Sequence, residues 1–404
     1  MGIKGLFAYV RSLNPNIVSK FELKQLAGWK LAVDVAFMCY QYKSGYITKA
    51  VERLDLLTQE INQDDATMVM IKGILTAVDK ILIAHVCPII VFDGQAPDLK
   101  GATKTDRRRK AQKTQDSVGR LKHIGNGILG NIPGFQLTED DYAFLKNRKK
   151  PITDIGTLRD RLLTDTKSCI VITPLEHTKL RAIFDAIGLP NLVADDEAEK
   201  TCAIMAYNRD VVAAYTVDSD ALLYCCPITI TKLTFPEYAT VPRPPSAEAY
   251  CFIDALGTTN LPIRAWKDFC IMNGTDFNKN SPKCGAITNH DLIHTYGDIA
   301  GMKAAKAFLE ERSLSQPWVK LAKIEKQLMA YQFEILNYEE VLTFINKPVS
   351  YDRSVMHIKP KEATFDESIP ALRALLGDRL LDCILPSCRS IMKKLANVAP
   401  GMRH

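Results

Sequence analysis

Three short apolar runs, each ending in an aspartate, constrain the fold of this chain most strongly. The runs are Lys30–Asp34, Pro88–Asp93 and Val211–Asp218, and they are rich in β-branched residues. Such runs, separated by helical patterns, are typical of buried parallel strands in an α/β sheet. Ligands of open α/β sheets bind at the carboxyl ends of the strands, so we expect the three aspartates to meet in one cleft.

The rest of the chain has mainly helical patterns. Apolar residues recur at helical spacing over residues 68–84, 180–187 and 197–207. Residues 100–165 have weaker periodicity and many charges, which indicates a large insertion between strands, and the pattern beyond Pro262 is again mostly helical. We therefore predict an α/β fold with a mostly parallel central sheet.

The composition limits the class of protein. A chain of 404 residues is long enough for one large α/β domain with insertions, or for two domains that share a core. The 11 cysteines are scattered without a C-x₂-C pair, which indicates reduced thiols. The sequence begins without an apolar signal stretch, and its longest apolar run, residues 81–92, is too short to span a bilayer. We expect a soluble, monomeric protein of the nucleus or cytoplasm with no membrane partner.

One segment carries much of the local excess of positive charge. The net charge is only +6, but residues 100–122 contain nine lysines and arginines against two aspartates. This charge run has two interpretations, a solvated helix face or a surface that binds the phosphates of a nucleic acid. The residues alone leave both open.

Seven carboxylates form the strongest chemical pattern in the sequence. They include an E-x-E and a D-x-D pair, and the set is Asp34, Asp93, Glu197, Glu199, Asp218, Asp220 and Asp276. Buried carboxylates repel one another and are costly unless they are paired or bound to a cation. One such acid alone is more often a helix cap or a surface residue, but three strand ends together with two pairs favour a shared cation site. Oxygen ligands without His or Cys select Mg²⁺ or Mn²⁺ over zinc, and two such ions about 4 Å apart suit phosphodiester hydrolysis.

Six short motifs occur along the chain, and five of them contain these acids. They are Met1–Leu6 (MGIKGL), Val33-Asp34, Val91–Pro97 (VFDGQAP), Asp196–Glu199 followed by Cys202-Ala203, Thr216–Leu222 (TVDSDAL) and Gly274–Phe277 (GTDF). In order and approximate spacing they resemble the motifs of the flap endonuclease and XPG family of structure-specific 5′ nucleases. The corresponding family patterns include MGI-x-GL, VFDG-x-x-P and EAEA-x-CA.

The resemblance implies a site for two Mg²⁺ ions, with Mn²⁺ as a substitute. Asp34, Asp93, Glu197 and Glu199 would lie nearer one ion, and Asp218, Asp220 and Asp276 nearer the other. Lys100 and Arg107 fall where the family has basic residues that contact the scissile phosphate, so we expect both to be catalytic. Tyr40 falls where the family has an aromatic that stacks on a base, although its ring would also suit the core. The other residues expected to contact DNA are Gly2, Lys104, Arg108, Arg109, Lys110 and Lys283.

The resemblance also divides the chain into five parts. They are an N-terminal nuclease region (1–99), a basic helical arch or cap (100–165), an internal nuclease region (166–261), a helix-turn-helix region that grips duplex DNA (262–348) and an extension of unknown role (349–404). The family's Gly-Ile-Gly turn is replaced around Pro282–Gly285, and the extension lacks the family's motif for a sliding clamp. This reduced pattern is more similar to relatives encoded by large DNA viruses.

The activity implied by the resemblance is that of a Mg²⁺-dependent flap endonuclease and 5′-3′ exonuclease. Its substrates would be branched or flapped DNA in replication, repair or recombination. A junction-resolving nuclease of the same family stays open, because the elements that distinguish it are altered here. A nuclease-inactive scaffold that binds nucleic acid would be expected to have lost acids, and an RNA-cutting PIN-type enzyme would be much shorter.

Overall fold

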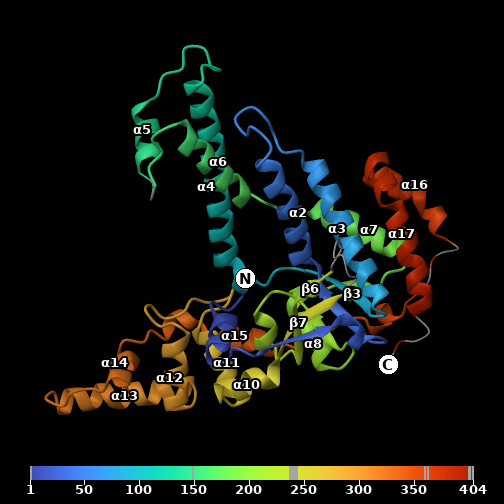
Figure 1. Ribbon diagram of the computed structural model, residues 1–404. Coiled ribbons are helices and arrows are strands. Elements are labelled where there is room, and N and C mark those ends of the chain that lie inside the picture. Colours follow the sequence, from blue (N-terminus) through green and yellow to red (C-terminus); the bar gives the residue numbers. More distant parts are fainter. Residues whose placement is uncertain are drawn as a thin grey trace.

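A seven-stranded mixed sheet forms the centre of the fold (Figure 1). The computed structural model describes residues 2–147, 150–235, 244–358, 361, 364–398 and 402, apart from the side chains of residues 102–104. The strands, with their bounds, are β1 (Val18–Glu22), β2 (Lys30–Asp34), β3 (Cys87–Phe92), β4 (Asn191–Val193), β5 (Ala213–Tyr215), β6 (Ile228–Thr234) and β7 (Ser246–Cys251).

The sheet is parallel over most of its width. Its strand order is β1-β7-β6-β5-β2-β3-β4, and the neighbours from β6 through to β4 pair in parallel. Only the pairs that β7 forms with β1 and with β6 are antiparallel. The predicted α/β fold with a mostly parallel sheet is therefore confirmed.

Helices packed on the sheet and on one another complete the body of the protein. They are α1 (Leu6–Leu13), α2 (Val35–Val51), α3 (Gln63–Ile83), α7 (Pro174–Ile187), α8 (Ala198–Tyr207), α9 (Asp220–Leu223), α10 (Phe252–Thr259), α11 (Ile263–Met272), α15 (Tyr338–Asn346), α16 (Phe365–Leu376) and α17 (Asp378–Val398). The helical patterns at residues 68–84, 180–187 and 197–207 correspond to α3, α7 and α8. None of the helices in the described part of the chain is long and apolar enough to cross a membrane.

The segment that follows β3 forms three helices that project from the body (Figure 1). These insertion helices are α4 (Gly101–Ile128), α5 (Glu139–Lys146) and α6 (Ile155–Ser168). They share a small apolar core with the far end of α2, where Ile47 and Val51 meet Leu121, Ile124 and Leu158. Asp34 ends β2 and is the N-cap of α2, so this one helix connects the end of β2 to the core of the insertion.

Two glycines near the end of α4 allow this second core to close. A Cβ atom at Gly125 would lie 2.5 Å from a Leu57 methyl carbon, and one at Gly127 would lie 2.2 Å from the Phe135 ring. Glycine weakens a helix interior. The close fit against these two side chains explains why glycine nevertheless occupies both positions.

Three further helices form a second arm, which extends from the body below the insertion in Figure 1. This C-terminal arm consists of α12 (Ala286–Tyr296), α13 (Ile299–Ser315) and α14 (Lys323–Met329), which pack against one another. Lys283, in the turn before α12, has a positive φ of 63°. The last helices, α16 and α17, return to the body, where α17 packs on α3 and α16 packs on α7. The sequence predicted no role for residues 349–404, and the structure shows that this extension covers the outer side of α3.

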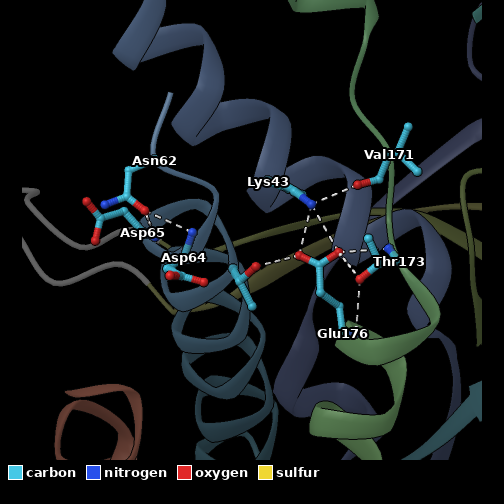
Figure 2. A network of polar contacts seen from close by, with 8 residues as sticks. Lys43, Asn62, Asp64, Asp65, Val171, Thr173 and Glu176 are labelled. Atoms are coloured by element: carbon cyan, nitrogen blue, oxygen red, sulfur yellow. Dashed lines mark hydrogen bonds and ion pairs between the residues drawn. The ribbon is translucent and has the colours of Figure 1, made fainter. Parts of the chain in front are cut away.

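A buried ion pair fixes the place where the insertion returns to the body (Figure 2). Lys43 in α2 donates to both carboxylate oxygens of Glu176 in α7, at 2.9 and 3.0 Å, and to the carbonyl oxygen of Val171, at 2.7 Å. Glu176 also accepts hydrogen bonds from Thr67 and from Thr173, the N-cap of α7. Burial alone would raise the pKa of the Glu176 carboxyl, but these hydrogen bonds outweigh it and the pKa is lowered. The ionised pair therefore ties α2, α3 and α7 to the segment that follows α6.

Candidate metal centre and nucleic-acid interface

The carboxyl ends of the central parallel strands open into one cleft. Asp34 ends β2, Asp93 follows β3, and Asp218 lies three residues beyond β5. We call this site the acidic cleft. It has a volume of about 380 Å³, and its charged lining residues are Asp34, Asp93, Lys100, Arg107, Asp196, Glu197, Glu199, Asp218 and Asp276.

Asp34 is held at the junction of a strand and a helix. Its Oδ1 atom caps α2 by accepting from the backbone N–H of Ala36 at 3.0 Å, and its Oδ2 atom accepts from the Thr216 hydroxyl at 2.9 Å. Thr216 comes directly after β5, and β5 pairs in parallel with β2, so the sheet brings the two side chains together. Burial, reinforced by the charges of Glu199 and Asp93, raises the pKa of Asp34 well above its usual value.

The first turn of α8 carries the E-x-E pair. Glu197 is the N-cap of this helix and Glu199 lies in its first turn, and both side chains are buried. The Asp93 carboxylate accepts from the backbone N–H of Ala198 at 3.0 Å, so an acid from the end of β3 caps the helix that holds the pair. Burial, followed by the charge of Asp218, raises the pKa of Glu199 to about 8.

The D-x-D pair lies where the chain leaves β5 and turns into α9. Asp218 lines the acidic cleft and accepts from the backbone N–H of Asp220 at 3.0 Å. Asp220 is only 1% exposed, and neither of its carboxylate oxygens has a hydrogen-bond partner among the described residues. Burial and the charge of Asp218 raise the pKa of Asp220 well above its usual value. A buried carboxylate without donors is costly unless a cation compensates it.

Gly2 lies directly against the D-x-D pair. Its φ is +75°, and a Cβ atom there would lie 2.0 Å from Asp218 Oδ1 and 2.8 Å from Asp220 Oδ1. Only glycine combines this backbone conformation with so close an approach. Gly2 therefore lies against two of the acids that the sequence assigned to cation binding, and its contact with DNA stays a prediction.

Two cations from the insertion contact the acids. Lys100, at the end of the 3-10 turn Asp98–Lys100, forms an ion pair with Glu197, and its ammonium group lies 3.4 Å from Asp276. Arg107, farther along α4, donates to both carboxylate oxygens of Asp276, at 2.8 and 2.9 Å. Asp276 comes from the loop between α11 and α12. The insertion and the loop before the C-terminal arm thus meet across the cleft.

The donor set of the acidic cleft fits a hard cation. Its oxygens come from carboxylates, and the described residues include buried oxygens of Glu197 and Asp220 that have no hydrogen-bond partner. Within the described part of the chain, no group of three or more His, Cys, Asp or Glu side chains is already arranged to hold a metal ion. In this arrangement Lys100 and Arg107 supply the compensating positive charge for Glu197 and Asp276.

The other residues predicted to contact DNA lie on exposed surfaces. Tyr40 in α2 is 48% exposed, so the alternative that its ring belongs to the core is wrong. Arg108, Arg109 and Lys110 are exposed on α4, and Lys283 is exposed in the turn before α12. Lys104 also lies in α4, but its side chain falls outside the described residues. Contact of these side chains with DNA stays a prediction.

Three residues of the site were not identified from the sequence. Thr216 orients Asp34, Asp196 lines the cleft and pairs with Lys347 at 3.2 Å, and Lys200 is a buried cation immediately after Glu199. A polar residue within an apolar run was the available signal for Thr216 and Lys200. Asp196 had no such signal, because acids are common before helices.

Two models of one nuclease family match the chain. The XPG N-terminal domain matches residues 1–114, and the XPG I-region matches residues 188–276. The two matches together span about half of the sequence and include all seven acids. This chain belongs to the XPG and flap endonuclease family of structure-specific 5′ nucleases.

Individual members of the family are distant from this chain in sequence. Flap endonuclease 1 of Candida tropicalis is 26% identical over 302 residues, which cover 74% of this chain and 69% of that protein. At such an identity the choice of DNA substrate is not carried over from that protein to this chain.

Solved structures of the family share the fold. The catalytic core of Rad2 in complex with DNA substrate has a TM-score of 0.60 at 15% identity, over 96% of this chain and 100% of that one. Flap endonuclease-1 from Methanococcus jannaschii has a TM-score of 0.53 at 17% identity, over 94% and 96%. The Holliday junction-resolving enzyme GEN1, in complex with product DNA and a Mg²⁺ ion, has a TM-score of 0.50 at 14% identity, over 96% and 78%.

Proposed function

We propose that this XPG-family protein cuts DNA where duplex meets a single-stranded 5′ end, as a flap endonuclease and 5′-3′ exonuclease in replication, repair or recombination. The observation that carries the proposal is the acidic cleft itself. Carboxylates from three strand ends, one helix start and one distant loop line it, and two cations reach into it from the insertion. A site of this charge pattern suits a phosphodiester together with divalent cations.

The cation-binding part of the proposal assigns the seven carboxylates to two ions. Asp34, Asp93, Glu197 and Glu199 would hold one Mg²⁺ ion, and Asp218, Asp220 and Asp276 the other, with Mn²⁺ as a substitute. Bound Mg²⁺ would activate a water molecule and stabilise the leaving oxygen of the phosphodiester. The raised pKa values of Asp34 and Asp220 support this assignment, because a bound cation favours their charged forms.

The chain's own cations would act on the phosphate. Lys100 and Arg107 line the cleft and are held there by ion pairs to Glu197 and Asp276. With divalent cations bound to these carboxylates, both side chains would be available to the oxygens of the scissile phosphate. Donors placed where negative charge develops commonly contribute several kcal/mol to the rate.

The two arms suggest a path for the nucleic acid. The insertion helices and the C-terminal arm extend on opposite sides of the start of the chain (Figure 1), which lies against the acids. We assign the insertion, with Arg108–Lys110 exposed on α4, to the single-stranded 5′ end. The C-terminal arm, with Lys283 exposed before α12, is assigned to the duplex.

The proposal is tested with purified protein on matched 5′-flap, nicked, gapped and four-way DNA substrates, in Mg²⁺, in Mn²⁺ and in excess EDTA. We expect cleavage of the 5′-flap substrate that needs either divalent cation. Asp218→Asn should lower the single-turnover rate by about 10² or more, because it removes one carboxylate from the cation site. Asp195→Asn is the matched control, since Asp195 is exposed beside the E-x-E motif and does not line the cleft. Undiminished cleavage in EDTA would refute the cation-dependent mechanism.

The same substrates test the second candidate function, junction resolution. The fold is shared with GEN1, a junction-resolving enzyme, as well as with flap endonuclease-1, so this alternative is tested alongside the first. Symmetric cutting of the four-way substrate at a higher rate than the flap would support it. Cation-dependent binding without cleavage of any substrate would instead indicate a nuclease-inactive scaffold.

A further inference from the structure

Lys200 is a buried cation directly beside the acidic cleft. Its side chain is 1% exposed, and it follows Glu199 in the first part of α8. The family pattern EAEA-x-CA has alanine at this position. Burying a lysine is costly, so the groups that compensate its charge indicate what it does.

The ammonium group of Lys200 holds the end of another helix. It donates to the carbonyl oxygen of Phe344 at 2.7 Å, and it lies 4.1 Å from the centre of the Phe344 ring. Phe344 is in the last turn of α15, and its carbonyl oxygen also accepts from the backbone N–H of Lys347, at 3.2 Å. A cation at a helix C-terminus is favourable both as a donor and through the helix dipole. Lys200 thus caps α15 from inside α8.

A pair of packed aromatic rings connects this cap to the acidic cleft. The rings of Phe344 and Phe277 lie 4.6 Å apart, and both side chains are buried. Phe277 directly follows Asp276, and the ammonium group of Lys100 lies 5.3 Å from the Phe277 ring centre. The order in space is Lys200, Phe344, Phe277 and then Lys100 beside Asp276.

We propose that Lys200 is a positioning residue, which fixes Asp276 and Lys100 in the cleft by holding Phe344 against Phe277. This inference rests on the proposed function, because it assigns Lys200 a role in the binding of Mg²⁺ and in the placement of the catalytic lysine. Aromatic rings between two cations have little freedom to move, since each cation is attracted to a ring face. Loss of the Lys200 ammonium group leaves the Phe344 carbonyl with the Lys347 N–H alone and removes the cation from the Phe344 ring, so Asp276 loses part of its support.

The test compares Lys200→Met with Lys267→Met in the full-length protein. Lys267 also contacts the end of α15, through the side chain of Asn346 at 2.8 Å, but it is not part of the ring pair. The first readout is the Mg²⁺ concentration that gives half of the maximal single-turnover rate on a 5′-flap substrate. The second is the rise in Tm that Mg²⁺ causes without DNA, which requires no cleavage.

We expect Lys200→Met to raise the half-saturating Mg²⁺ concentration about 10-fold or more, as for residues that support metal ligands, and to reduce the Mg²⁺-induced rise in Tm. Lys267→Met should behave as wild type in both. Phe344→Leu, which keeps the backbone carbonyl, should change both readouts in the same direction, and it carries the test if Lys200→Met does not fold. In both readouts the double variant Lys200→Met/Phe277→Leu should be impaired no more than the worse single variant, because both substitutions act through the same pair of rings.

Different results would overturn the proposed function and the positioning role of Lys200. If wild-type protein shows neither cleavage nor a rise in Tm with Mg²⁺, the proposed function and the role of Lys200 both fall. If the wild type binds Mg²⁺ but cuts no substrate, the proposed function falls and the rise in Tm still tests Lys200. If the wild type responds to Mg²⁺ and Lys200→Met matches Lys267→Met in both readouts, only the positioning role is overturned.

Discussion

The guanidinium group of Arg107 binds both carboxylate oxygens of Asp276, at 2.8 and 2.9 Å, although the two residues are 169 positions apart. Arg107 belongs to the insertion, and Asp276 belongs to the loop before the C-terminal arm. Together with Lys100 beside the same carboxylate, this pair closes the cleft from the insertion side. The insertion therefore contributes two side chains, those of Lys100 and Arg107, to the candidate active site.

Lys100 and the exposed cations of α4 should have different roles, Lys100 in the cleavage step and the exposed cations in DNA binding. If Lys100 acts on charge that develops in the transition state, Lys100→Ala should lower the saturated single-turnover rate by about 10² or more and leave DNA affinity nearly unchanged. Arg108→Ala is the control, because Arg108 is exposed on α4, the helix that follows Lys100, and is absent from the cleft lining. A normal saturated rate with weakened binding would remove Lys100 from the catalytic residues.

The close approach of Gly2 to the acids predicts a steric effect on catalysis. Gly2→Ala places a Cβ atom 2.0 Å from Asp218 Oδ1, so the carboxylate or the chain start must move. We expect the single-turnover rate to fall by about 10-fold or more, because small displacements of catalytic groups have effects of this size. Gly5→Ala is a matched control, because Gly5 also has a positive φ, +72°, but has no atom within 4 Å of the added Cβ. Equal losses in the two variants would assign the effect to backbone strain alone.

The exposed cations of α4 should determine the salt dependence of DNA binding. Binding of a cationic side chain to a phosphate releases counterions from the DNA. Charge reversal of Arg108, Arg109 and Lys110 should therefore reduce the slope of log affinity against log salt by roughly 1 for each phosphate that is no longer neutralised. The control reverses Arg379, Arg389 and Lys393, which are exposed on α17 on the far side of the body. An unchanged slope in the α4 variant would show that the basic run is only a solvated helix face.

The buried pair of Lys43 and Glu176 predicts an effect on stability that depends on pH. Lys43→Met leaves the Glu176 carboxylate buried without its cation and should cost about 3–5 kcal/mol in the free energy of unfolding at neutral pH. The double variant Lys43→Met/Glu176→Met should recover most of that loss. Breaking the exposed pair Arg159–Asp55 should cost less than about 1 kcal/mol and is the control.

The sign of the pH dependence follows from the lowered pKa of Glu176. A group with a lower pKa in the folded state contributes stability above its unfolded pKa, near 4.5, and loses it as the pH falls through the folded value. Urea unfolding between neutral and acidic pH should therefore show a loss in the wild type that is smaller in the double variant. Parallel curves would show that the pair does not contribute to acid unfolding.

Some properties of this protein follow from local sequence alone. The apolar runs before Asp34, Asp93 and Asp218 predict parallel strands, and the topology of parallel sheets places their carboxyl ends at one edge. The meeting of these three aspartates was therefore predictable, because side-chain pattern and strand direction are local properties. The helices α3, α7 and α8 were predictable for the same reason, since helical periodicity is visible over a few turns.

Only the tertiary structure decided which distant residues meet. Nothing in the local pattern pairs Arg107 with Asp276, Lys43 with Glu176 or Lys200 with Phe344, residues that are 169, 133 and 144 positions apart. Nor did the sequence show that α17 covers α3, because an apolar helix face specifies burial but not its partner. These contacts depend on how whole helices pack against one another, and that packing is fixed by the shape and charge of many side chains at once.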